Sequence, residues 1–161
     1  MAENLVIEQS FPKKEKYIQL YSQLEALLIG ETDLIARQSN FCAALKFGMG
    51  FFWVGFYKPS GDELILGPFQ GPVACLRIKK GIGVCGSAWQ KEKTIIVPDV
   101  NRFPGHIACS SLSKSEIVVP VFNPSGKVAL ILDVDHTEIG TFDAVDKKYI
   151  EQLVCLIYNY E

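Results

Sequence analysis

The sequence predicts an α+β fold, in which helices from both ends of the chain cover one face of a mainly antiparallel sheet. Apolar residues recur at helical spacing near both ends. Between them, two pairs of apolar stretches are joined by turns rich in proline and glycine, the pattern of β-hairpins. A loop-rich middle segment, residues 67–115, separates the hairpins and is expected on the opposite face of the sheet.

Two helices are expected at the start of the chain. Residues 13–28 carry an apolar stripe with i, i+3, i+4 spacing, and Gly30 ends this helix. Thr32 or Asp33 can cap a second helix that runs to about Phe47.

The remaining elements follow from alternation, turns and caps. We expect strands at 51–59 and 63–69, a short helix at 86–91, a short strand at 94–97, strands at 116–122 and 127–135, and a last helix at 143–158. The chain has 161 residues and no internal repeat or linker, so residues 1–161 are interpreted as a single domain.

Composition narrows the possible partners. The net charge is −2 and no long basic run occurs, which disfavours nucleic acid as a partner. The N-terminus lacks the pattern of a signal peptide, and no apolar stretch is long enough to cross a membrane. A cytoplasmic protein is therefore expected, with no membrane association, and its five cysteines would be reduced, metal-bound or catalytic.

Strand alternation predicts a pocket with aromatic walls. Side chains of a strand point to alternate faces, so Phe51, Trp53, Gly55 and Tyr57 share one face. Two aromatic rings on either side of a glycine suggest a hollow between them. We expect this hollow to lie between the sheet and the loop-rich segment.

Acidic residues gather at the end of another strand. Asp133 and Asp135 share one face, and Glu116 opens the adjoining strand. Such a cluster would favour a positively charged ligand group, repel a phosphate and raise the pKa of at least one carboxyl. The alternative is a strand end exposed to water.

The five cysteines fall into two groups. Cys42 and Cys155 lie among apolar residues of expected helices and are interpreted as core residues. Cys75, Cys85 and Cys109 all lie in the loop-rich segment. Cys85 lies among glycines at the start of the short helix, where its thiol pKa could be lowered. Cys109 follows a histidine by three residues, and either that imidazole or a helix N-terminus could keep it as a nucleophilic thiolate.

Redox catalysis is one of three interpretations of these thiols. Cys75, Cys85, His106 and Cys109 would supply four zinc ligands, but no CxxC pair occurs and the spacing is not typical of a zinc site. A purely structural role is the third possibility.

Three segments resemble a known family. The segments GPVACLRIKKGIGVCGSAW, VPDVNRFPGHIACSSLSKSEIVVPV and ILDVD are similar to those of the free methionine-R-sulfoxide reductases, which are stand-alone GAF domains. The resemblance runs from about residue 51 to 135. It implies a single GAF domain that reduces free methionine-R-sulfoxide. A GAF module that senses a small ligand without catalysis is the alternative.

The resemblance also implies the roles of individual residues. The expected assignments are Cys109 as nucleophile, Cys75 as resolving thiol, Cys85 as secondary thiol, Glu116 or Asp135 as the acid that protonates the departing oxygen, and Trp53, Tyr57 and Asp133 as substrate-binding residues. The reaction would pass through a sulfenic acid and a disulfide, with thioredoxin as external reductant and without a metal or organic cofactor. A homodimer is compatible with this family.

Overall fold

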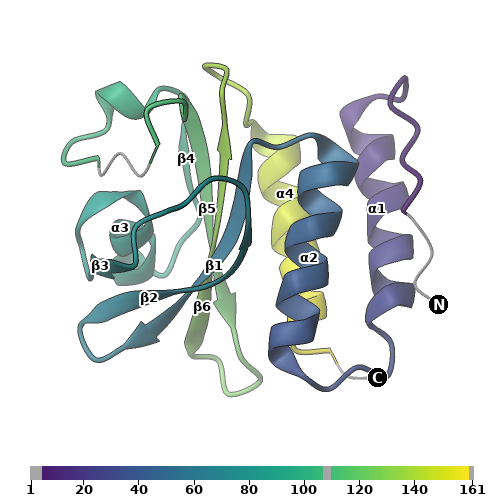
Figure 1. The fold of residues 1–161 in the computed structure, drawn as a ribbon, viewed down its shortest axis with the longest axis horizontal. Helices are drawn as coiled ribbons and strands as arrows, with labels where there is room; N and C mark the ends of the chain where they lie inside the picture. The colour runs from purple at the N-terminus through teal and green to yellow at the C-terminus, as the bar shows by residue number, and fades with distance from the viewer. Residues whose placement is uncertain (1–4, 107–109, 160–161) are drawn as a thin grey trace.

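A six-stranded antiparallel sheet forms the centre of the molecule, in a computed structural model that describes residues 5–106 and 110–159 (Figure 1). The strand order is β3-β2-β1-β6-β5-β4. The strands are β1 (Trp53–Ser60), β2 (Glu63–Gln70), β3 (Arg77–Lys79), β4 (Ile95–Val97), β5 (Ser115–Phe122) and β6 (Val128–His136). The helices are α1 (Lys13–Leu28), α2 (Leu34–Met49), α3 (Gly83–Lys91) and α4 (Ala144–Val154), with 3-10 turns η1 (Val100–Arg102) and η2 (Cys155–Ile157). The predicted α+β class and antiparallel hairpins are confirmed.

Three helices lie on one side of the sheet. Helix α2 packs on β1 and β2, and α4 packs on β5. Helix α1 contacts α2 and α4 and lies farther from the sheet (Figure 1). The N-terminal helix is therefore an outer layer, and α2 takes the position against the sheet. No helix among residues 5–106 and 110–159 combines the length and apolar character of a membrane span.

The helix ends follow local capping chemistry. The Asp33 side chain accepts a hydrogen bond from the Ala36 amide at 2.9 Å, which identifies Asp33 as the cap of α2. Asp143 and Asp146 form a capping box at the start of α4. The helix predicted to run to Tyr158 ends at Val154 and continues as a 3-10 turn.

One buried arginine joins distant ends of the chain. Arg37 is only 1% exposed, and its guanidinium donates to backbone carbonyls near the end of α1 and near the C-terminus. The acceptors are the carbonyl oxygens of Leu28, Glu31, Leu156, Ile157 and Asn159. These bonds satisfy carbonyls that helix ends leave without intrahelical partners.

Each face of the sheet has its own core. Val54 and Phe56 pack with the helices, whereas Trp53 and Tyr57 pack on the opposite face with residues of α3. The predicted alternation along β1 is confirmed. Phe51 is an exception, because it precedes the strand and joins the helix-side core.

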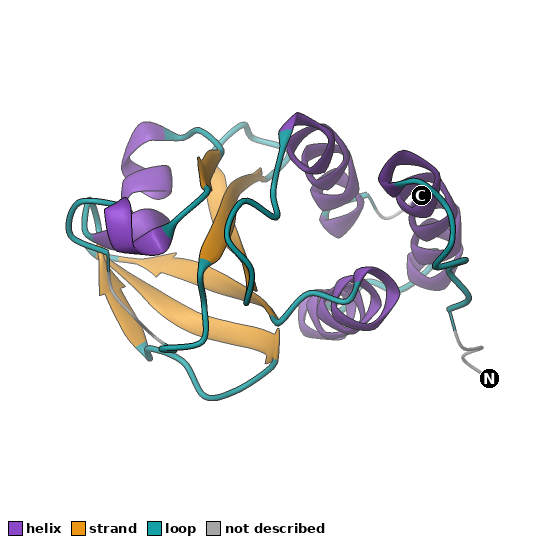
Figure 2. Ribbon diagram, turned by 90° about the horizontal axis from the view of Figure 1, so that it is seen from above, coloured by secondary structure: helices purple, strands orange, loops and turns teal. Residues whose placement is uncertain are grey.

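The middle segment contains more regular structure than predicted. It adds β3 to the sheet edge, and α3 begins at Gly83 and covers the face away from the other helices (Figure 2). A close approach explains one of its glycines. A Cβ at Gly86 would lie 2.3 Å from the Lys79 carbonyl oxygen, so only glycine lets α3 pack against this turn.

Candidate active site

Strand register assembles the acidic residues into rows across the sheet. Trp53 of β1 pairs with Asp135 of β6, which pairs in turn with Glu116 of β5. In the next row on the same face, Asp133 lies beside Gly55. Directly opposite residues of antiparallel strands have Cβ atoms about 5 Å apart, so these carboxylates must interact. The predicted cluster of carboxylates is confirmed.

A small cavity lies over this cluster. Its volume is about 20 Å³, enough for about one water molecule. It is lined by Ile78, Gly83, Val84, Cys85, His106, Ser113, Glu116, Asp133 and Asp135. Acids, a thiol and an imidazole therefore meet in one enclosed space.

Burial changes the ionisation of all three carboxyls. Burial, and then the neighbouring Asp135, raise the pKa of Glu116 well above its usual value. Burial and Glu116 raise the pKa of Asp133, and burial and Asp133 raise the pKa of Asp135. These groups therefore resist ionisation, and the alternative of a water-exposed strand end is wrong.

One carboxyl oxygen in this cluster has no hydrogen-bond partner. Asp133 is 7% exposed, and its Oδ1 atom is buried and unpaired among the described residues. An unpaired buried oxygen is costly and usually indicates a missing ligand or water. Asp135, in contrast, accepts a hydrogen bond from Ser113. This bond partly offsets the rise of the Asp135 pKa. Ser113 was not predicted, because the turn that carries it has no periodic pattern.

Cys85 lies against the carboxyls. Its Sγ lies 3.9 Å from Glu116 Oε1 as a weak donor. Although Cys85 is in the first turn of α3, burial and then Asp133 and Glu116 raise the pKa of its thiol well above the usual value. The expectation of a lowered pKa is wrong, because burial, together with the neighbouring carboxyls, outweighs the helix terminus.

His106, which precedes Cys109 by three residues in the sequence, lines the cavity. Its Nε2 atom lies 3.6 Å from Glu116 Oε2, and burial lowers the pKa of the imidazole. Cys109 itself lies outside the described residues, and its role as nucleophile stays a prediction. Three residues upstream of it, the chain contacts the carboxyl cluster.

The loop that carries Cys75 is anchored by the two predicted aromatic residues. Trp53 Nε1 donates to the Pro72 carbonyl at 2.9 Å, and the Tyr57 hydroxyl donates to the Cys75 carbonyl at 3.1 Å. Cys75 is disulfide-bonded, so in this state it offers no thiolate to a metal. The alternative of a zinc site that includes Cys75 is therefore incompatible with this structure.

The expected hollow at Gly55 is filled. A Cβ at Gly55 would lie 2.2 Å from Trp53 Cη2, because the indole lies flat over the glycine. The indole also stacks on Phe69 at 5.5 Å between ring centroids. Trp53 and Tyr57 thus lie beside the cavity, in the same apolar cluster as Cys85, and do not line it.

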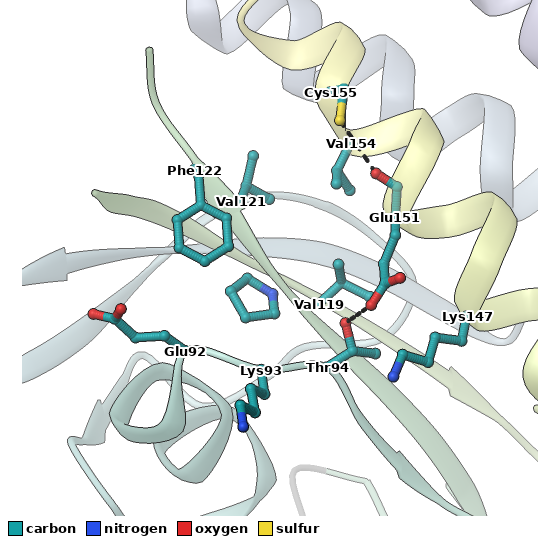
Figure 3. Close-up of a pocket in the computed structure, with 11 residues that line it drawn as sticks. Glu92, Lys93, Thr94, Val119, Val121, Phe122, Lys147, Glu151, Val154 and Cys155 are labelled. Carbon is teal, nitrogen blue, oxygen red and sulfur yellow. Dashed lines mark hydrogen bonds between the residues drawn. The ribbon is translucent and has the colours of Figure 1, made fainter. Parts of the chain in front are cut away.

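The two cysteines predicted to be core residues differ. Cys42 is buried, as predicted, whereas Cys155, the first residue of the 3-10 turn after α4, is exposed, so its predicted core role is wrong. Cys155 lies at the rim of a larger hollow of about 420 Å³ between β5 and α4 (Figure 3). There its thiol donates to the Glu151 carbonyl at 3.3 Å, and Thr94 bonds the Glu151 carboxylate. Of the predicted catalytic residues that the structure describes, none lines this hollow.

Comparison with known proteins identifies related chains. The GAF domain family matches residues 41–157. "GAF domain-containing protein A" of Dictyostelium discoideum is 55% identical over 99% of this chain and 100% of its own length. The "Free methionine-R-sulfoxide reductase" of Saccharomyces cerevisiae is 40% identical, over 97% of this chain and 91% of its own. The X-ray structure of free methionine-R-sulfoxide reductase from Neisseria meningitidis, in complex with its substrate, is 44% identical, with a TM-score of 0.91 over 96% of this chain and 94% of that one.

Proposed function

This chain belongs to the GAF-domain family of free methionine-R-sulfoxide reductases, and on that premise we propose that it reduces free methionine-R-sulfoxide by cysteine chemistry. The observation that carries the mechanism is the buried cluster of Glu116, Asp133 and Asp135. Carboxyls that resist ionisation can donate a proton near neutral pH. The same cluster can accept a positively charged ligand group.

Substrate recognition is assigned to the acidic row and the aromatic residues beside it. The unpaired Oδ1 of Asp133 is suited to the α-ammonium group of a free amino acid. Trp53 and Tyr57 lie beside the cavity and would offer aromatic surface to the methyl and sulfur of the sulfoxide once side chains between them and the ligand move. Because the cavity holds about one water, the substrate needs more room than this conformation provides, and side chains around it must move on binding.

The chemical step is assigned to Cys109. Its thiolate attacks the sulfoxide sulfur while the carboxyl of Glu116 or Asp135 protonates the departing oxygen. The sulfoxide oxygen passes to the sulfur of Cys109, so methionine leaves and the cysteine becomes a sulfenic acid. The substrate sulfur is reduced by two electrons, and Cys109 is oxidised by two.

Regeneration is assigned to Cys75. Its thiol condenses with the sulfenic acid of Cys109, water leaves, and a disulfide forms. The proposal is supported by the state of Cys75, which is disulfide-bonded in the structure and so can take part in such a bond. An external dithiol of the thioredoxin type then reduces the disulfide by exchange, which fits a reducing compartment such as the cytoplasm. Cys85, with its raised pKa, is a secondary thiol that exchanges slowly.

A single-turnover assay tests the division of roles. The reduced protein is mixed with excess free methionine-R-sulfoxide, without reductant, and methionine is counted per chain. Cys109→Ser should form none, whereas Cys75→Ser should form about one methionine per chain and recycle slowly with thioredoxin. Cys42→Ser changes a buried thiol far from the cavity and is the matched control. Full single turnover by Cys109→Ser would refute the nucleophile assignment.

A further inference from the structure

We propose that Cys85, Glu116 and Asp133 form a site for a thiophilic divalent cation, with Zn²⁺ as the best fit. In the second part of the proposal, which rests on the proposed function, this cation competes with methionine sulfoxide for the acidic cluster. Its sulfur ligand differs from the disulfide-bonded Cys75, because Cys85 carries a free thiol.

The distance between two of the ligand atoms is close to that in a zinc site. One sulfur and two carboxylate oxygens lie within 4.8 Å of one another, and the separation of Cys85 Sγ from Glu116 Oε1 is 3.9 Å. Bond lengths of about 2.3 Å to sulfur and about 2.0 Å to oxygen place tetrahedral sulfur and oxygen ligands about 3.5 Å apart. Side-chain shifts of a few tenths of an ångström would therefore close the Cys85–Glu116 pair around a metal.

Two further observations favour a bound ligand of the size of an ion. Asp133 Oδ1 is buried, lies beside this cavity and has no partner among the described residues. In this conformation the cavity volume of about 20 Å³ suits one water or one ion. His106 also lines it, with Nε2 3.6 Å from Glu116 Oε2, and so offers a neutral nitrogen as fourth ligand.

Proton balance gives the pH dependence of binding. Each raised pKa means that the thiol and both carboxyls hold protons before the cation enters. Binding breaks the S–H bond and the carboxyl O–H bonds, and the protons pass to the buffer. No group is oxidised or reduced. Affinity should therefore rise as pH rises, until the three groups are ionised without metal.

The binding test uses the full chain in its oxidised form, so that the redox thiols cannot supply ligands. Zn²⁺ is titrated against a chromophoric chelator, and Co²⁺ is titrated while thiolate charge-transfer absorbance is recorded in the near ultraviolet. We expect about one ion per chain, and a loss of affinity of roughly tenfold or more in Cys85→Ser and in Asp133→Asn. Circular dichroism confirms that both variants are folded.

Matched cysteine variants locate the ion. Cys42→Ser and Cys155→Ser should retain the affinity and the cobalt absorbance. The proposal is overturned if the oxidised protein binds no Zn²⁺, if Cys85→Ser binds as tightly as the parent, or if the absorbance disappears in Cys155→Ser. Asp133→Asn keeps the proposal testable even if Cys85→Ser does not fold.

A separate activity assay tests the competition between Zn²⁺ and the substrate. Zn²⁺ should raise the KM for free methionine-R-sulfoxide without changing kcat, and a chelator should reverse the effect. Stoichiometric binding at Cys85 without any sulfoxide turnover would refute the proposed function and leave the metal site standing. Turnover that Zn²⁺ leaves unchanged, at concentrations that fill the site, would overturn the competition.

Discussion

Replacing Asp133 by asparagine should make the protein more stable than the parent, and increasingly so as the pH rises. The substitution keeps the shape of a side chain that is 7% exposed and removes its ionisable proton. Burial and Glu116 raise the pKa of Asp133 in the folded protein. In the unfolded chain this pKa returns to about 3.9.

The sign and size follow from proton linkage. Above the unfolded pKa and below the folded one, the unfolded chain binds one proton fewer than the native protein at this position, so the parent loses stability as pH rises. The loss is about 1.4 kcal/mol per pH unit. The free energy of unfolding of Asp133→Asn should therefore gain about 1.4 kcal/mol on the parent for each pH unit above the unfolded pKa, until the folded pKa is passed.

Urea unfolding at a series of pH values measures this difference. The disulfide must be kept in one redox state throughout, since its reduction would change stability by itself. Asp62→Asn removes an exposed carboxylate and serves as the control, with a difference that stays nearly constant across the series. A constant difference for Asp133→Asn as well would refute the idea that the fold keeps this carboxyl protonated.

Three further substitutions test the packing that holds the site in place, each measured by urea unfolding. Arg37→Met leaves several buried carbonyls without a donor and should cost at least about 3 kcal/mol, whereas Arg102→Met, at an exposed side chain, should change stability by less than about 0.5 kcal/mol. Gly86→Ala places a Cβ 2.3 Å from the Lys79 carbonyl oxygen and should cost about 1–3 kcal/mol, because backbone must move; an unchanged stability would contradict this contact. Tyr17→Phe removes a buried 2.8 Å hydrogen bond to the capping box of α4 and should cost about 1–3 kcal/mol, and a loss near zero would show that water replaces the hydroxyl.

Much of the scaffold could be predicted because its signals are local. Asp33 precedes an apolar helical pattern, and the structure confirms it as a cap. Alternation along β1 and β6 placed Trp53 and Asp133 on the face away from the helices, since strand geometry has a fixed period of two.

The features that were missed depend on contacts between distant segments. Alternation gives the face of Trp53 but not its rotamer, and the rotamer fills the space over Gly55. The start of the helix at Cys85 can be predicted from the sequence. The contact of its thiol with the carboxyl of Glu116, 31 residues away, cannot. The apolar neighbours of Cys155 indicated a core position, but its own side chain is exposed while those of Leu156 and Ile157 are buried.

The register of β1, β6 and β5 also has a consequence for how this site can evolve. A shift of β6 by one residue would place Asp133 and Asp135 in the hydrophobic core between the sheet and helices α2 and α4. The same shift would move Leu132 and Val134 out of that core. A mispaired chain would thus be both unstable and chemically inert, so the aliphatic residues that never meet a ligand enforce the alignment of those that do. Substitutions in this core are expected to reduce turnover only when they weaken the strand register. The acidic residues on the other face can therefore change, and with them the preferred ligand, while the strand pairing stays the same.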